Sequence, residues 1–341
     1  MNESVDIEIT VGLVTYNRPE YLKQAVRSVL QQTLKNFKLI ISNDYQDVAV
    51  TFDSLGIKND SRIKIINQER NLGEIDNMNY LLGIARGEWF VWLADDDLLH
   101  PEFLRLAYEM IIANSESNVV GVFSNYGAAR SPVGLFPTAI KSNSGNCLCY
   151  GPSEFLMDYT SRKNRLIGCY GVMHIDVLRK IGGIPQLGNS FGPYGDTLIP
   201  ILLAEHGRLC WLDEPLVFLT VHANSLSCKS TDFLAYTSAE YELLASLKRV
   251  CASKTVNVPP NKIIANMIKW FTINEWIVLS REPSFSVYEV CRIFVKHQLT
   301  VNVPMLSMTH RIHHLLFVLW FLGMCSVEWA SKRFRAALAM K

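Results

Sequence analysis

The sequence predicts an α/β protein with an open, largely parallel sheet in its first half and a helical region after about residue 230. Three observations support this prediction. Apolar, β-branched runs alternate with helix-periodic segments near the N-terminus, which is typical of right-handed βαβ units. Polar residues directly follow the apolar runs. After about Ser230 the apolar spacing is helical to the end of the chain.

The elements of the first half follow from local patterns. The first run, ITVGLVTY, is almost continuously apolar, as expected for a strand covered on both faces. Pro19 marks the first turn of the next helix, and Gly87 closes a later one. Strands are predicted over 9–16, 37–44, 62–67 and 88–94, and helices over 19–30 and 74–85.

A second half is predicted from about Asn125, beginning with a loop-rich stretch. The segment GVMHIDVLRKIGGIP, residues 171–185, predicts a strand, a helix and a Gly-Gly turn. Asp196 opens another predicted helix, Gly207 ends it, and two short strands are expected to follow.

Three consecutive carboxylates, Asp95, Asp96 and Asp97, stand directly after the strand at 88–94. They could form a solvated turn that caps a helix beginning at Pro101, or they could form a cation site. Strand ends in an open α/β sheet meet at one edge, so Asp44, Asn71 and the triplet are expected to converge. This favours the cation site, and carboxylates beside phosphates suit Mn²⁺ or Mg²⁺.

Composition excludes some classes of protein. The net charge of +1 provides no basic surface for nucleic acid. The eight cysteines are scattered without redox or zinc spacing, so we expect reduced thiols. The N-terminus MNESVDIEIT lacks the apolar stretch of a secretory signal, and we expect a cytoplasmic location.

Five signals occur in order along residues 7–228: VTYNRPEYLKQAVRSVLQQT, Asp44, NLG at 71–73, WLADDDLLHP, and GD…AEHGRLCWLDEPLVFLTVHANSLS. Together they resemble the family 2 glycosyltransferases of the GT-A fold. The resemblance implies a GT-A domain over 1–228 with a Rossmann-like first half. Residues 1–124 would be its nucleotide-sugar half and 125–228 its acceptor half. Residues 229–341 would form the helical C-terminal region.

The resemblance also implies roles for individual residues. Asp95 would hold ribose, Asp96 would bind the metal with help from Asp97, and His222 would approach the metal or diphosphate. A lone histidine after a strand is also commonly structural. The residues expected around the nucleotide are Thr15, Tyr16, Arg18, Asp44, Asn71 and Gly73.

The resemblance further implies that Asp196 is the catalytic base, and direct displacement needs a carboxylate to accept the acceptor hydroxyl's proton. The family usually has a Glu-Asp pair here, whereas this chain has Gly195-Asp196. The alternative is that Asp196 only caps its helix.

These roles imply an inverting, metal-dependent glycosyltransferase that uses a nucleoside diphosphate sugar, most commonly a UDP-sugar. The acceptor would be a glycan or lipid-linked glycan, as in bacterial surface polysaccharide biosynthesis. Two alternatives remain. A nucleotidyltransferase lacks support, because no Gly-rich phosphate loop follows the first strand. A catalytically inactive nucleotide-sugar-binding subunit would explain Gly195.

The C-terminal tail, residues 301–341, differs from the rest of the chain in its apolar run and its excess of basic residues. Residues 315–327 are largely apolar, which is shorter than the roughly 20 residues that span a bilayer. Residues 301–341 carry five basic residues and one acid, and this favours a helix lying on anionic lipid at the inner face of the cell membrane. A core or oligomer helix is the alternative.

Overall fold

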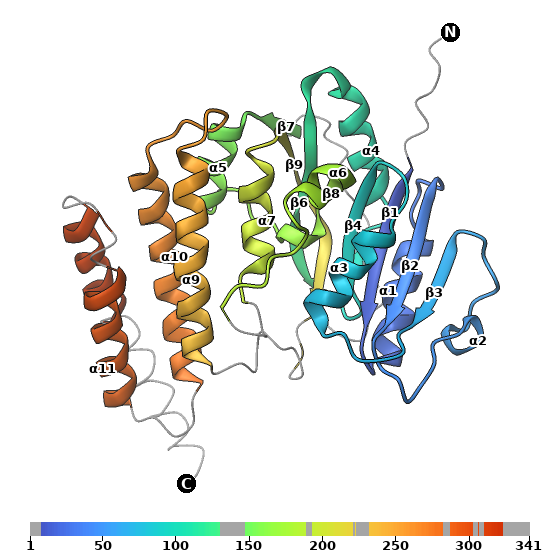
Figure 1. Cartoon of the computed structure of the whole chain (residues 1–341), viewed down its shortest axis with the longest axis horizontal. Coiled ribbons are helices and arrows are strands. Elements are labelled where there is room, and N and C mark those ends of the chain that lie inside the picture. Colours follow the sequence, from blue (N-terminus) through green and yellow to red (C-terminus); the bar gives the residue numbers. More distant parts are fainter. Residues whose placement is uncertain are drawn as a thin grey trace.

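The computed structural model describes residues 8–129, 147–188, 193–220, 222, 232–281, 287–302, 306 and 310–322. In Figure 1 the strands of the first half lie at one end of the molecule and the C-terminal helices at the other. This arrangement confirms the predicted α/β fold with a helical C-terminal region.

A single sheet organises the described part of the chain. Its strands are β1 (Ile9–Thr15), β2 (Phe37–Asn43), β3 (Ile63–Asn67), β4 (Trp89–Ala94), β5 (Leu98–Leu99), β6 (Val119–Ala129), β7 (Cys147–Tyr150), β8 (Val172–His174) and β9 (Arg208–Thr220). They run in the order β3-β2-β1-β4-β8-β6-β9-β5, and β7 pairs with β9. The first four are mutually parallel, so their carboxyl ends share one edge.

Helices connect and flank these strands. They are α1 (Pro19–Leu30), α2 (Phe52–Leu55), α3 (Glu74–Ile84), α4 (Phe103–Ala113), α5 (Pro152–Thr160), α6 (Ile175–Lys180), α7 (Gly195–Leu203), α9 (Phe233–Cys251), α10 (Pro260–Ser280) and α11 (Val287–His297), with 3-10 turns η1 (Ser115–Ser117) and η2 (Gly168–Tyr170). Helix α11 continues as the π-helical turn η3 (Gln298–Asn302). In Figure 1, α9 and α10 stand between α7 and α11.

The parallel strands form where the apolar runs predicted them. All seven residues of β1 are buried, as expected for a strand covered on both faces. Helix α1 begins at Pro19, whose missing N–H costs nothing in a first turn. Its buried residues, Leu22, Ala25, Val26, Ser28 and Val29, lie at helical spacing.

The expectation of two short strands after Gly207 is wrong, because β9 is one strand of 13 residues. Asp213, Glu214 and Pro215 interrupt the apolar pattern, but they lie beside an irregularity in the pairing with β6, between Ser124 and Asn125. Proline is tolerated at such bulges because no ladder hydrogen bond is required there. The bulge therefore joins the two apolar segments into one strand.

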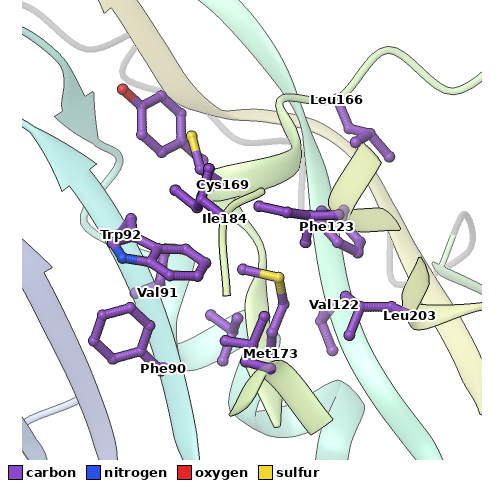
Figure 2. Packing of buried hydrophobic residues seen from close by; sticks show 14 of the residues in the cluster. Phe90, Val91, Trp92, Val122, Phe123, Leu166, Cys169, Met173, Ile184 and Leu203 are labelled. Carbon is purple, nitrogen blue, oxygen red and sulfur yellow. The ribbon is translucent and has the colours of Figure 1, made fainter. Parts of the chain in front are cut away.

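Buried side chains from the two halves of the sheet pack against each other in one hydrophobic cluster. Figure 2 shows Phe90, Val91 and Trp92 of β4 facing Met173 of β8, with Val122 and Phe123 of β6 beyond. Trp92 is fully buried, and its indole N–H donates to the Met78 carbonyl at 2.8 Å. This packing fixes the position of β4, which carries the acidic triplet, relative to the second half.

The last described helices pack in a second, smaller hydrophobic cluster. A helix over 310–322 lies on α10 and α11 through Val318, which is buried with Leu279, Val290 and Phe294. Its other apolar face, with Ile312, Leu316, Leu319 and Trp320, is largely exposed. None of the helices that the structure describes is both long and apolar enough to traverse a bilayer. The basic residues expected beyond Glu328 lie outside the described residues.

Candidate functional site

The ends of β1 and β4 lie side by side at the edge of the sheet. Val14 and Ala94 are paired in the register of these strands, so Thr15 and Asp95 follow as neighbours. The Thr15 hydroxyl donates to Asp95 Oδ2 at 2.7 Å, and the Tyr16 N–H donates to the same oxygen at 3.3 Å. Burial raises the pKa of Asp95, and the Thr15 and Arg18 contacts counteract that rise.

Arg18 links two members of the triplet. Its Nη1 atom lies 3.2 Å from Asp95 Oδ1 and 2.8 Å from Asp96 Oδ2. The same Asp96 oxygen lies 2.9 Å from His222 Nε2, and the His222 ring stacks on Tyr21 with centroids 4.9 Å apart. Residues from both halves of the sequence therefore meet at the Asp96 carboxylate.

Asp97 is bound through both of its oxygens to the second half of the sequence. Oδ1 accepts from the Thr220 N–H at 2.9 Å, and Oδ2 accepts from the Tyr170 hydroxyl. Burial, reinforced by the nearby charge of Asp96, raises the pKa of Asp97 to about 7. These contacts tie the end of β4 to η2 and to the end of β9.

Asp44, Asn71 and Gly73 lie close together, and their hydrogen bonds hold one loop. Asp44 accepts from the N–H groups of Leu72 and Gly73 at 2.8 and 2.9 Å. Asn71 Oδ1 accepts from the Gly73 N–H at 2.8 Å. Gly73 has a φ of 84° at the start of α3, a conformation that side-chain-bearing residues rarely adopt. The three residues thus hold the loop that begins α3.

Asp196 lies in the first turn of α7, where its backbone is closely packed against η2. A Cβ atom placed on Gly168 would lie 1.8 Å from the Asp196 carbonyl oxygen. Burial raises the pKa of Asp196, whereas hydrogen bonds from Thr197 and the charge of Arg162 lower it. Arg162 is held over the Trp270 ring at 4.2 Å. Turn η2 therefore contacts two candidate site residues. Its Gly168 packs against the Asp196 backbone, and its Tyr170 hydroxyl donates to Asp97.

Glu74 is a site residue that the sequence analysis missed. Part of Glu74 is exposed, yet its carboxyl group lies among protein atoms, and burial raises its pKa. Asp96, Asp95 and Asp196 raise that pKa further, while Arg18 lowers it. Glu74 thus lies near Asp95 and Asp96 of the triplet and near Asp196. One feature of the sequence could have identified Glu74: it is an acidic residue directly after the NLG loop, in the first turn of a predicted helix.

Asp96, Asp97 and His222 do not form a compact three-ligand group. Among the described residues, the one group of three or more His, Cys, Asp or Glu side chains with ligand atoms within 4.8 Å of each other is Glu240, Glu275 and His297. The Asp96 carboxylate and the His222 imidazole remain the close pair of potential metal ligands beside the triplet.

We predict that Gly168→Ala destabilises the protein, because the added methyl group would collide with the Asp196 carbonyl and push α7 from η2. The free energy of unfolding should fall by about 1–3 kcal/mol, the range for overpacked interiors. Urea denaturation measures this change. Gly83→Ala is the matched control, since its Cβ would meet nothing within 4 Å in α3 and should be neutral or stabilising. Equal stability of the Gly168 variant and wild type would contradict the packing argument.

Comparison with known proteins is consistent with this geometry. The family model described as glycosyl transferase family 2 matches residues 10–173. An uncharacterised glycosyltransferase of Haemophilus influenzae is 28% identical over 116 residues, which are 34% of this chain and 36% of that protein. The chain thus aligns with about a third of that relative's length. A second uncharacterised glycosyltransferase of the same organism is 22% identical over 262 residues, 75% of this chain and 83% of its own.

Two solved structures share the fold. S. aureus TarS 1–349 in complex with UDP-GlcNAc has a TM-score of 0.60 at 14% identity, covering 89% of this chain and 83% of its own. The mannosyltransferase PcManGT from Pyrobaculum calidifontis, in complex with GDP-Man and Mn²⁺, has a TM-score of 0.51 at 14% identity, covering 92% and 87%. The chain therefore carries a glycosyl transferase family 2 domain at residues 10–173, and it shares its fold with these two solved structures.

Proposed function

We propose that this protein is an inverting, metal-dependent glycosyltransferase. It moves a sugar from a nucleoside diphosphate sugar, with a UDP-sugar as the first choice, to a hydroxyl group of a glycan or lipid-linked glycan. One observation carries the proposal: Asp95, Asp96 and Asp196 all lie near enough to Glu74 for their charges to raise its pKa. This supports a single site that contains the carboxylates proposed for the nucleotide and metal and the proposed base.

The donor half of the proposal rests on the residues after β1. Arg18 is a cation beside the strand ends, where ligands of open α/β sheets bind, and it suits a diphosphate. Tyr16 is 50% exposed and meets Tyr45 edge to face at 5.2 Å, so an aromatic surface is available to a base. The similarly folded TarS and PcManGT structures contain UDP-GlcNAc and GDP-Man.

A divalent cation fits Asp96 and His222. Their Oδ2 and Nε2 atoms lie 2.9 Å apart, about the separation of two ligands on one ion, and carboxylate with imidazole suits Mn²⁺. Arg18 lies 2.8 Å from the same oxygen, and this ion pair supports the choice of Asp96 as the anionic ligand. A bound Mn²⁺ or Mg²⁺ would neutralise the charge on the departing diphosphate.

The remaining residues position these groups. Asp95 is tied to Thr15 and Arg18, and we assign it to the ribose. Asp97 keeps the triplet in place through Tyr170 and Thr220. Asp44, Asn71 and Gly73 shape the loop against the nucleotide.

Asp196 acts as the base. The acceptor oxygen attacks the anomeric carbon while its proton passes to the Asp196 carboxylate, and the bond to the diphosphate breaks with its electron pair leaving on the diphosphate. A single displacement inverts the configuration. Burial, which raises the pKa of Asp196, makes it a better proton acceptor than an ordinary aspartate. Were Asp196 only a helix cap, the chain would be an inactive nucleotide-sugar-binding subunit.

We also propose that the enzyme works in surface polysaccharide assembly at the cytoplasmic face of the bacterial membrane. Ile312, Leu316, Leu319 and Trp320 follow each other at helical spacing on the exposed face of the helix over 310–322. Such a face can lie in the headgroup region of a membrane. A lipid-linked acceptor would be presented at that surface.

The first test concerns the metal ligand. Asp96→Asn should abolish Mn²⁺-dependent binding of UDP in titration calorimetry, because it removes the anionic ligand without altering core packing. Asp53→Asn, at an exposed position of α2, is the matched control and should bind as wild type does. Unchanged Mn²⁺-dependent affinity in the Asp96 variant would refute the metal assignment.

The second test concerns the base. Asp196→Asn should keep UDP affinity but lower transfer by at least about 10², the lower end for a positioned base. In wild type, activity should fall at acidic pH as Asp196 becomes protonated below its raised pKa. The pH–activity profile of the variant should lack this fall. Asp176→Asn, in the exposed first turn of α6, serves as control. Retained configuration, seen by NMR of the product, would exclude direct displacement.

The third test concerns the membrane surface. Truncation before residue 310 would also remove Val318 and His314, which are buried, so substitution is the sharper experiment. The double variant Leu319→Gln, Trp320→Gln should release the protein from anionic vesicles and keep its thermal stability. Leu234→Gln, which alters an exposed leucine of α9, should bind vesicles as wild type does. If wild type ignores anionic vesicles in sedimentation at low salt, the proposed membrane contact fails.

A further inference from the structure

Three polar side chains that the proposed reaction does not use meet inside the C-terminal helices. Glu240 comes from α9, Glu275 from α10, and His297 from the end of α11. Glu240 and Glu275 are 3% and 0% exposed, and the His297 side chain is 13% exposed. Each carboxylate needs compensation, because an uncompensated buried charge costs several kcal/mol.

Neighbouring donors satisfy only part of this group. The Tyr194 hydroxyl donates to Glu240 Oε1 at 2.9 Å. Asn302 donates to Glu275 Oε1 at 3.1 Å, and Gln298 donates to Oε2. Two buried atoms, Glu240 Oε2 and His297 Nε2, have no well-directed hydrogen bond, although both lie beside Glu275.

The three side chains are close enough together to ligate one ion, and one separation matches that of two zinc ligands. One atom from each of the three side chains lies within 4.8 Å of the other two. His297 Nε2 is 3.2 Å from Glu275 Oε1, and two ligands at tetrahedral zinc distances are about 3.3 Å apart. The His297 Nε2 atom does not make a hydrogen bond with this oxygen despite the short distance. If both atoms bound one ion instead, the nitrogen lone pair would point at the ion and not at the oxygen.

The surroundings resemble the outer contacts of metal ligands. Amide donors from Gln298 and Asn302 orient Glu275, and the Tyr194 hydroxyl orients Glu240. Hydrogen bonds of this kind hold ligating carboxylates in place. Two carboxylates and one imidazole are a donor set that zinc accepts, with a fourth position open to water.

We propose that Glu240, Glu275 and His297 form a structural site for a divalent transition-metal ion, zinc in the first instance, that joins α9, α10 and α11. The ion neutralises both carboxylates and supplies a partner for Glu240 Oε2 and His297 Nε2. Through Tyr194, which immediately precedes α7, the site also braces the helix that carries Asp196. This site is separate from the Asp96 and His222 pair.

A shared proton is the competing arrangement. Burial raises the pKa of Glu240, so a neutral Glu240 could donate to Glu275. That arrangement leaves His297 Nε2 without a directed partner. The two arrangements respond differently to Glu240→Gln, which imitates a protonated glutamate but is a poor metal ligand.

The test measures metal bound by the tag-free, full-length protein without nucleotide. Wild type should retain one equivalent of Zn²⁺ after gel filtration, measured by elemental mass spectrometry, and should lose thermal stability when a chelator removes it. Co²⁺ in place of Zn²⁺ should produce visible absorption bands. Glu240→Gln and His297→Ala should each lose this equivalent.

Two controls separate this site from other effects. Glu242→Gln changes an exposed position of the same helix and should retain the ion. Asp96→Asn should also retain it, so this proposal and the proposed function fail independently. The metal site is refuted if wild type takes up neither Zn²⁺ nor Co²⁺, or if Glu240→Gln binds the ion as wild type does. Wild-type stability of Glu240→Gln without any metal would establish the shared proton.

Discussion

The buried carboxylate of Asp97 is the constraint on which the arrangement of the site depends. It joins the end of β4 to the end of β9 through the Thr220 N–H and to η2 through the Tyr170 hydroxyl. A buried carboxylate without such partners would be costly, so the chain has little freedom in how it turns after β4. With Asp97 held inward, Asp95 and Asp96 are left facing Arg18.

Three adjacent carboxylates are tolerated because each has a different environment. Asp95 is held by Thr15 and Arg18, and Asp96 by Arg18 and His222. The raised pKa of Asp97, about 7, means that the triplet carries fewer than three full negative charges near neutral pH. Repulsion is therefore reduced where desolvation is greatest, and the most accessible carboxylate of the three is the one available to a cation.

Local sequence patterns predicted the parallel strands, α1, α3 and the position of the triplet at the end of β4, because these depend on periodicity and on where strands end. They did not predict the continuity of β9, since a bulge stabilised by pairing with β6 is a tertiary effect. Glu74 was missed because its role depends on its closeness to Asp196, far away in sequence. The sequence analysis also did not predict the cluster of Glu240, Glu275 and His297, because each residue comes from a different helix.

The position of Tyr194 has a consequence for how such a protein could be recombined. This residue adopts a φ of 65° before α7, and its hydroxyl contacts Glu240 of α9 and Asn274 of α10. The family match ends at residue 173, so Asp196 and the helices that brace it lie beyond the matched segment. A chimaera joined after residue 173 would inherit the acidic triplet from one parent and the placement of Asp196 from the other. Exchange of the C-terminal helices would then have to include α7, because Tyr194 anchors α7 to α9 and α10.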